Sequence, residues 1–402
     1  MKILLLNAGS SSLKASLVES GDGRTLASGL ADWAGSATHY RYTGPDGTEH
    51  SAEVSWKGLS RAVQSFISDL LQKKPETLSD RSAISSVGHR VVHGGPFTSS
   101  VQITPEIRSR LADLADLAPL HNPPSLEALA AAEAELPGVP QVAVFDTAFH
   151  ATLPSHAFTY PLPQRWTRDW GIRRFGFHGL SHAYCARRAA EMLQKPPEAL
   201  RLVICHLGHG CSASAVQGGR CVDTTMGFTP LEGLMMATRC GSIDPSIVLH
   251  VQEHHGLTVD QVEAALSRES GLLGVSGVSA DMRQVLAAAK AGQEPARLAL
   301  AIYAHRVRQA VGALTVTMGG LDALVFTAGV GENAAEVRES ICAGLECLGL
   351  DLDRNANASS RPDADVALPC SRARILVIAT REDVTMLREV IQVLGPSRAA
   401  PE

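Results

Sequence analysis

Short apolar runs separated by turns of small polar residues open the chain. Residues 3–6 are all Ile or Leu, the run stops at an Asn-Ala-Gly-Ser-Ser-Ser segment over 7–12, and a second apolar stretch follows over 13–18. Runs of this length on either side of a Gly- and Ser-containing segment are typical of paired strands. We therefore predict a strand, a tight turn and a second strand at the N-terminus.

Residues 202–216 repeat this pattern. An apolar run at 202–205 leads into a segment rich in Gly, His and Ser over 206–212, and a second apolar stretch occupies 213–216. The repeat predicts two related halves of the chain. Each half would offer one turn of backbone N–H groups to one shared ligand.

The remaining periodicity predicts further elements. Apolar residues at helical spacing predict helices at 59–71, at 181–193, from about 334 and after 383. Apolar segments bounded by polar residues predict strands at 84–92, 141–145, 324–326 and 375–378, with more short strands within 31–57. Residues 105–136 look helical, with interruptions at Pro119 and at Pro123-Pro124.

Length and composition limit the classes of protein to consider. A chain of 402 residues usually divides into about two or three domains. With 45% hydrophobic and 19% charged residues, the profile is that of a folded globular protein. The formal net charge of −5, without long Lys/Arg runs, gives no reason to expect a nucleic-acid partner. No apolar run reaches the roughly 18 residues of a membrane span.

The cysteines point to a reducing compartment. There are eight, the first is Cys185, and no two form a Cys-x-x-Cys pair. A disulfide framework therefore cannot span the fold, and reduced thiols in a cytoplasmic protein are expected.

The two predicted turns have the composition of phosphate-binding loops. Gly9 with Ser10 and Ser12 lets backbone amides approach phosphate oxygens without a Cβ clash, and Lys14 just beyond could add charge. A plain hairpin turn is the alternative for either copy alone. The second copy, at 208–212, favours phosphate binding.

A third Gly-rich segment allows a rival interpretation. Gly329-Val330-Gly331 follows a predicted strand and opens a helix, which also fits a dinucleotide-binding fold and hence a dehydrogenase. Its late position and the hairpin pairing of the preceding strands count against that. No Walker-type motif is present, so a P-loop fold is not expected.

Four charged residues stand where strands end or small residues gather. Arg90 and Arg239 would either pair with a structural acid or bind an anion. Because the chain also has two predicted phosphate-binding turns, we favour a pair of arginines that binds the transferring phosphoryl group, a phosphoryl clamp. Asp146 and Glu382 are natural magnesium ligands or orienters of magnesium-bound water. A lone strand-end Asp also serves as a helix cap or turn former.

The spacing of the histidines favours a hydrogen-bond donor to phosphate over a pair of metal ligands. His178 and His182 are four residues apart and could share one helix face as metal ligands. No third ligand has convincing spacing, so zinc is not expected, and a histidine that donates to phosphate fits better. His121, His150 and His206 are interpreted as structural or supporting residues.

Seven segments in one order along the chain resemble the acetate kinase family. They are residues 7–14, 88–95, 118–123, 145–150, 173–179, 223–233 and 326–333. The resemblance implies an α/β fold of the sugar kinase, Hsp70 and actin superfamily, which is ribonuclease H-like, with two domains and an interdomain cleft. The expected domains are an N-terminal lobe of residues 1–147 plus 384–402 and a nucleotide-binding lobe of residues 148–383.

The resemblance also implies residue roles. The implied catalytic residues are Arg90, Asp146, His178 and Arg239, and the implied metal-binding residues are Asn7 and Glu382. The acid would be held by Arg90 and by a small pocket of Val92, Leu120, Phe177 and Pro230. The implied nucleotide-binding residues are Ser10, Ser12, Lys14, His206, Leu207, Gly208, His209, Gly210, Asp281, Met282, Arg283, Gly329, Val330, Gly331, Glu332 and Asn333.

The activity implied is reversible transfer of the ATP γ-phosphoryl group to acetate, giving acetyl phosphate and ADP. Mg²⁺ or Mn²⁺ would be the metal, the partners would be small molecules, and the enzyme would be a cytoplasmic homodimer without membrane contact. Propionate kinase is the first alternative, with Val92 as the discriminating position. A non-catalytic ATP-driven switch on the same fold is the second.

Several positions depart from the family pattern. His209 stands where the family usually has Asn, which would make the charge of the second turn depend on pH. The other departures are Leu180 for Thr, Cys240 for Ser, Ser242 for Asp, Arg381 for Asn and Asp383 for Glu.

Overall fold

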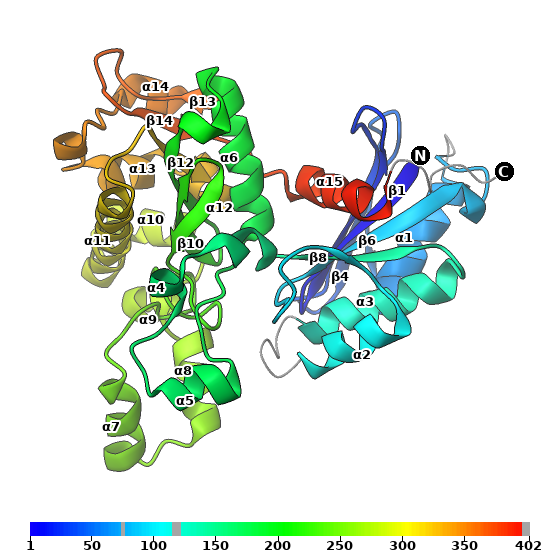
Figure 1. Ribbon diagram of the computed structural model, residues 1–402, viewed down its shortest axis with the longest axis horizontal. Coiled ribbons are helices and arrows are strands. Elements are labelled where there is room, and N and C mark those ends of the chain that lie inside the picture. The colour runs from blue at the N-terminus through cyan, green and yellow to red at the C-terminus, as the bar shows by residue number, and fades with distance from the viewer. Residues whose placement is uncertain (74–76, 115–121, 396–402) are drawn as a thin grey trace. The chain divides into compact units, whose positions relative to one another are not determined.

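The hairpin predicted at the N-terminus starts the first of two sheets. The computed structural model describes residues 1–73, 77–114 and 122–395 (Figure 1). The chain forms two compact units, one of Met1–Phe149 with the segment from Arg381, here unit 1, and one of His150–Thr380, here unit 2.

The sheet of unit 1 is built outward from its first two strands. Strand β1 (Lys2–Ala8) pairs antiparallel with β2 (Ser12–Glu19) and parallel with β6 (Ile84–Val91), which in turn pairs parallel with β8 (Gln141–Phe145). The full order is β5-β4-β3-β2-β1-β6-β8-β7. The outer strands are β3 (Thr25–Asp32), β4 (Thr38–Thr43), β5 (Glu49–Val54) and β7 (Val101–Gln102).

Helices cover this sheet with their apolar faces. Helix α1 (Leu59–Gln72) buries residues at helical spacing, namely Leu59, Ala62, Val63, Phe66, Ile67 and Leu70. The other helices are α2 (Pro105–Asp113), α3 (Asn122–Glu135) and α15 (Glu382–Leu394), with a 3₁₀ turn η1 (Arg81–Ala83). Pro123 and Pro124 lie in the first turn of α3, where a missing N–H breaks no helical bond.

Unit 2 repeats the central strand pairing of unit 1. Strand β9 (Arg201–Leu207) pairs antiparallel with β10 (Cys211–Gln217) and parallel with β12 (Ala323–Thr327), which pairs parallel with β14 (Arg374–Val377). The order is β11-β10-β9-β12-β14-β13, with β11 (Arg220–Thr224) and β13 (Ala364–Asp365) at the edges. This is the order of β3-β2-β1-β6-β8-β7, so the predicted repeat is present in the strand pairing.

The helices of unit 2 are more numerous. Those nearest the site are α6 (Gly179–Leu193), α10 (Met282–Lys290), α12 (Ala328–Asn333) and the long α11 (Glu294–Thr317). The others are α4 (Ser155–Phe158), α5 (Gln164–Trp170), α7 (Ser246–His255), α8 (Val259–Arg268), α9 (Gly271–Ser276), α13 (Ala335–Cys342) and α14 (Arg354–Ser359), with the 3₁₀ turns η3 (Ala148–Thr152), η4 (Pro197–Ala199) and η5 (Glu346–Leu348). Figure 1 shows α5, α7 and α8 at the end of the unit away from β13 and β14.

The parallel strands bring polar residues to one edge of each sheet. The carboxyl ends of β1, β6 and β8 carry the segments after Asn7, Arg90 and Phe145, and those of β9 and β12 carry the segments after Leu207 and Thr327. Ligands of open α/β sheets bind at this edge.

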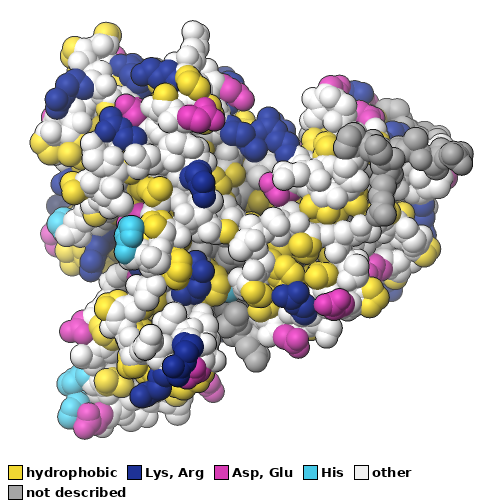
Figure 2. Space-filling view, viewed as in Figure 1, with side chains coloured by type: hydrophobic (Ala, Val, Ile, Leu, Met, Phe, Trp, Pro, Cys, Tyr) yellow, Lys and Arg dark blue, Asp and Glu magenta, His cyan; other side chains and the backbone are white. Residues whose placement is uncertain are grey.

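The surface and the helices give two further facts. On the face seen in Figure 2, basic and acidic side chains are interspersed and do not form one large patch. Within the part of the chain that the structure describes, no helix has the length and apolar character needed to cross a membrane.

We predict that Gly88 of β6 tolerates no side chain. A methyl group there would lie 2.6 Å from Val390 Cγ2 of α15 and 3.0 Å from Leu5 Cδ2, and such overpacking costs about 1–3 kcal/mol. Gly88→Ala should therefore lower the midpoint of urea unfolding. Gly21→Ala is the control, because its methyl group meets no atom within 4 Å. Equal midpoints for the two variants would contradict the close packing of α15 on β6.

Candidate active site

The polar residues of unit 1 form one hydrogen-bonded cluster, here the Arg90 cluster, made of Asn7, Arg90, Asp146 and Glu382. Arg90 donates through Nε to Asp146 Oδ1 at 2.9 Å and through NH2 to Asp146 Oδ2 at 2.6 Å. Its NH1 donates to Asn7 Oδ1 at 3.0 Å and lies 3.6 Å from Glu382 Oε2. Asn7 Nδ2 completes the ring of contacts by donating to Glu382 Oε2 at 3.0 Å.

Charge decides what this cluster can attract. It holds one cation and two carboxylates, so it carries one net negative charge. Burial alone would lower the pKa of Arg90, but attraction to Asp146 and Glu382 outweighs it and raises the pKa above its ordinary value. The sequence left open whether Arg90 pairs with an acid or binds an anion, and in this structure it is paired. The Arg90 cluster therefore suits a cation better than an anion.

The oxygen ligands of the cluster fit magnesium or manganese rather than zinc. Asp146 is 1% exposed and both its oxygens accept from Arg90, so it orients that guanidinium. Among the described residues, the contacts of Glu382 with Asn7 and Arg90 involve Oε2, so Oε1 could bind a hard cation. No group of three or more His, Cys, Asp or Glu is placed to hold a metal among the described residues. Mg²⁺ suits such a site because it keeps several waters and binds few carboxylates.

The first predicted phosphate turn lies beside this cluster. Gly9 N donates to Ser12 O at 2.8 Å, which closes the turn that carries Ser10. Asn7 lies directly opposite Lys14 in the β1–β2 register. Directly opposed residues share one face of a sheet, so Lys14 and Asn7 are on the same face.

Two predicted substrate contacts belong to unit 1. Val92 follows β6 and is buried. Leu120 lies outside the described residues.

The second turn gathers the predicted anion binders of unit 2. A methyl group built on Gly210 would lie 3.2 Å from His178 Nε2 and 3.5 Å from Arg239 NH1. His178 Nε2 and the Arg239 guanidinium therefore both border the turn. Three groups that sequence spacing could not connect thus meet at one place in unit 2.

Arg239 differs from Arg90 in its partners. Its NH1 donates to Pro230 O at 3.1 Å, and no carboxylate lies within ion-pair distance of it in the part of the chain that the structure describes. Burial lowers the pKa of Arg239 from its ordinary value, but an arginine starts so high that it stays charged at neutral pH. This guanidinium offers an uncompensated positive charge, the property that an anion site requires.

Histidines surround the same turn. His178 stacks on His206, with ring centroids 4.1 Å apart, and His206 Nδ1 lies 2.8 Å from Ser181 Oγ. Leu207 is a buried residue of β9, and Gly208 N donates to Gly210 O at 3.0 Å. His178 precedes α6 in a left-handed conformation with φ of 56°, so it does not share a regular helix face with His182.

His209 lies on the exposed part of the turn. Partial burial and the positive charge of Arg239 lower its pKa below the ordinary histidine value. It is therefore neutral at pH 7 and takes up a proton only in more acidic solution.

The predicted nucleotide residues lie on two short segments. Residues 329–333 form most of α12, where Glu332 Oε1 accepts from Thr380 N at 2.9 Å and from Thr380 Oγ1 at 2.8 Å. The buried Arg338 donates to the carbonyls of Gly331 and Glu332, both at 2.9 Å. Gly329 and Gly331 thus lie in a braced helical turn.

The second nucleotide segment begins α10. Asp281 caps this helix by accepting from Arg283 N at 2.8 Å, and its carboxylate also pairs with the Arg283 side chain. Met282 is buried between them. In this structure Asp281 and Arg283 are bound to each other.

Three supporting groups were not among the predicted site residues. Ser212 contacts both His178 and His182. Arg174 NH1 donates to the carbonyls of Thr224, Thr225 and Met226 at 2.9, 3.0 and 3.2 Å, and its NH2 donates to Glu232 at 2.8 Å. These bonds hold the segment that carries Pro230.

Asn122 is the third such residue. Its side chain accepts from His93 N at 3.0 Å and donates to His93 O at 3.0 Å. A buried Asn just before two prolines at a helix start was a readable signal for an anchor of this kind.

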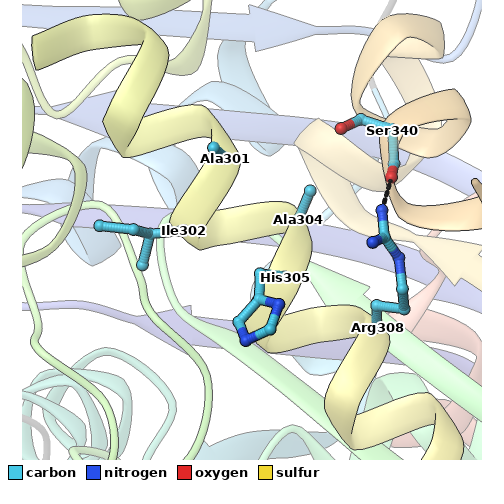
Figure 3. Close-up of a pocket in the computed structure, with 6 residues that line it drawn as sticks. All are labelled: Ala301, Ile302, Ala304, His305, Arg308 and Ser340. Carbon is cyan, nitrogen blue, oxygen red and sulfur yellow. Dashed lines mark hydrogen bonds between the residues drawn. The ribbon is translucent and has the colours of Figure 1, made fainter.

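A separate hollow of about 460 Å³ lies beside α11 and α13 and includes none of the predicted site residues. It is lined by Ala301, Ile302, Ala304, His305, Arg308 and Ser340 (Figure 3). Arg308 donates to the carbonyls of Ser340 and Ile341 in the last turn of α13, and its positive charge stabilises the C-terminal end of that helix.

Comparison with known proteins gives one consistent result. The model of the Acetokinase family matches residues 2–388. An acetate kinase of Cyanothece sp. is 47% identical over 403 residues, which cover 98% of either chain.

Solved structures agree. The acetate kinase of Porphyromonas gingivalis superposes with a TM-score of 0.90 and 39% identity, covering 98% of this chain and 100% of that one. A propionate kinase of Francisella tularensis gives a TM-score of 0.89 and 38% identity, covering 96% and 98%. The predicted sugar kinase, Hsp70 and actin-like α/β fold class is thereby confirmed.

We predict that His209 makes anion binding at the second turn depend on pH. Because its pKa is lowered, the proton arrives only below the usual histidine range, and it then adds positive charge beside Arg239. The ADP affinity of the wild-type protein should therefore rise on acidification more than that of His209→Asn. Calorimetric titrations of both proteins between about pH 5 and 8 measure this, since the titration of ADP itself is common to both. Parallel curves over that range would contradict the prediction.

Proposed function

Since the chain belongs to the acetokinase family, it is a kinase of that family, and we propose that it transfers the γ-phosphoryl group of ATP reversibly to acetate, forming acetyl phosphate and ADP. The observation that carries the proposal is the convergence of His178 and the uncompensated Arg239 on the turn at Gly210. Phosphoryl transfer asks a protein chiefly for positioning and for positive charge around the moving group.

We assign the phosphates of the nucleotide to unit 2. The backbone amides around Gly208 and Gly210 and the Arg239 guanidinium supply donors and charge, and His178 adds an N–H donor beside them. The braced turn of 329–333 and the start of α10 would hold the adenosine. A rigid turn loses little entropy on binding, which favours its use as a nucleotide platform.

We assign the divalent cation to the Arg90 cluster of unit 1. Glu382 and Asn7 would hold it, with Asp146 orienting Arg90 beside it. When bound, Mg²⁺ or Mn²⁺ would neutralise phosphate charge. A bound divalent cation would change the net charge of the cluster from −1 to +1. Arg90 uses three of its five N–H donors in the bonds described above, and the other two could then bind a substrate carboxylate.

The acid needs little activation. A carboxylic acid of this kind is ionised at neutral pH, so no general base is required for its attack on phosphorus. We propose the apolar residues Val92, Phe177 and Pro230, with Leu120, as the contacts of the methyl group. We propose that the transfer is direct and in line.

Propionate is the second candidate substrate, because the chain is also similar to a propionate kinase. A difference of one methylene group in an apolar pocket is worth only about 1–3 kcal/mol. The dehydrogenase and the non-catalytic switch lose support, because family membership points to neither. A homodimer in the cytoplasm stays a prediction, consistent with the eight free cysteines of the structure.

Arg239→Ala tests the assignment of the anion site. Removing its charge should lower kcat for acetyl phosphate formation on the order of 10²–10³-fold, as loss of a preorganised donor does. A coupled assay of ADP release measures the rate. Arg306→Ala, on an exposed position of α11, is the matched control and should keep the wild-type rate. Near-normal turnover of Arg239→Ala would refute the assignment.

Val92→Ala tests the acid pocket. The smaller side chain should raise the ratio of kcat/KM for propionate to that for acetate by about 10-fold or more, because one methylene group in an apolar pocket changes specificity by about 10–200-fold. Parallel assays with acetate, propionate and butyrate at fixed ATP and magnesium measure the ratio. An unchanged ratio would refute the assignment of Val92 to the acid pocket. It would not affect the assignment of phosphoryl transfer, which the Arg239 variant tests separately.

A further inference from the structure

We propose that His182 and Ser212 form a one-way hydrogen-bond relay that keeps the ring proton of His178 on Nε2, the nitrogen that borders the turn at Gly210. This inference rests on the proposed function, because it makes His182 and Ser212 positioning residues for His178. Neither residue is among those implied by the family resemblance.

One hydroxyl group connects the two rings. Ser212 Oγ, on β10, lies 2.9 Å from His178 Nδ1 and 2.8 Å from His182 Nε2. Ser212 and His182 are both fully buried, so water does not compete for these bonds. His178 precedes α6 and His182 lies one turn into it, which brings both rings to the same strand.

Counting protons limits the arrangement. A serine hydroxyl has one proton to donate, so at least one of the two histidines must donate to Ser212 Oγ. In the first arrangement His182 Nε2–H donates to Ser212, and Ser212 donates to His178 Nδ1. In the second the direction is reversed, and His182 must carry its proton on Nδ1. If both rings donated, Ser212 would need a further acceptor, and no other bond of its hydroxyl is found among the described residues.

The surroundings of His182 select the first arrangement. Its Nδ1 is buried and has no hydrogen-bond partner among the described residues. A proton there would be an unpaired buried N–H, which costs about 1–3 kcal/mol, whereas unpaired acceptors are tolerated somewhat better. Burial and the neighbouring His150 and His206 lower the pKa of His182 well below its usual value, so it holds a single ring proton.

The consequence falls on His178. With Nδ1 accepting from Ser212, a neutral His178 carries its proton on Nε2, which would lie 3.2 Å from a Cβ at Gly210. The ring is held flat against His206, and Arg239 lies across the same turn. The relay therefore aims an N–H donor at the place assigned to the transferring phosphoryl group, before any substrate binds.

The test locates the proton directly. In protein labelled with ¹⁵N-histidine, the ring nitrogens of His178, identified by their loss in His178→Gln, should show protonated Nε2 and unprotonated Nδ1 in the substrate-free wild type. Protonated Nδ1 would overturn the proposal. Because no substrate is present, this result does not depend on whether the protein phosphorylates acetate, which a separate assay of the wild type decides.

Two pairs of variants test the consequence for the rate. Ser212→Ala and His182→Met break the relay, and each should lower kcat on the order of 10–100-fold, the range for groups that orient another residue, with KM for ATP and acetate nearly unchanged. Ser212→Thr keeps the hydroxyl and His182→Gln keeps an N–H donor near the Nε2 position, so both should recover most of the rate. Unchanged kcat in the breaking variants, or equal losses in all four, would contradict the relay.

Discussion

Two half-buried arginines lie in opposite electrostatic settings, and the proposed function depends on that difference. Arg90 is bound by Asp146 and lies near Glu382, so its charge is more than neutralised within unit 1. Among the residues that the structure describes, Arg239 donates to the Pro230 carbonyl and the Met236 sulfur and to no carboxylate. A buried charge without a counter-ion is costly to keep, and an anionic ligand relieves that cost. The placement of Arg239 therefore favours an anionic ligand at this position in unit 2.

The repeated sheet explains where these groups lie. In both units an antiparallel hairpin is followed by parallel strands, so the turn after the first strand and the ends of the next strands meet at one edge. In unit 1 that edge became acidic through Asp146 and Glu382. In unit 2 the corresponding edge holds histidines and Arg239. The same strand arrangement thus positions a net-negative group of side chains in unit 1 and a half-buried guanidinium with histidines in unit 2.

Much of the fold could be predicted from local pattern, because β1 and β9 each contain an unbroken apolar run, residues 3–6 and 202–205, and the turns that follow consist of small and polar residues. Hydrogen-bond partners that are distant in the sequence could not be predicted in this way. Asp146 lies 56 residues from Arg90 and Ser212 lies 34 from His178, so no spacing rule connects them. The four-residue step from His178 to His182 suggested a shared helix face. His178 is instead the left-handed N-cap of α6, yet both rings contact Ser212 Oγ. The Leu120 assignment lies outside the described residues.

The central claim is that Arg239, and not Arg90, offers a free cationic group to the phosphoryl donor. Modification by phenylglyoxal, followed by peptide mass spectrometry with and without acetyl phosphate, tests it most directly. Arg239 should react in the free protein and be protected by acetyl phosphate, while Arg90, held by its carboxylates, should react far more slowly in both conditions. Unprotected modification of Arg239, or protection confined to Arg90, would contradict the claim.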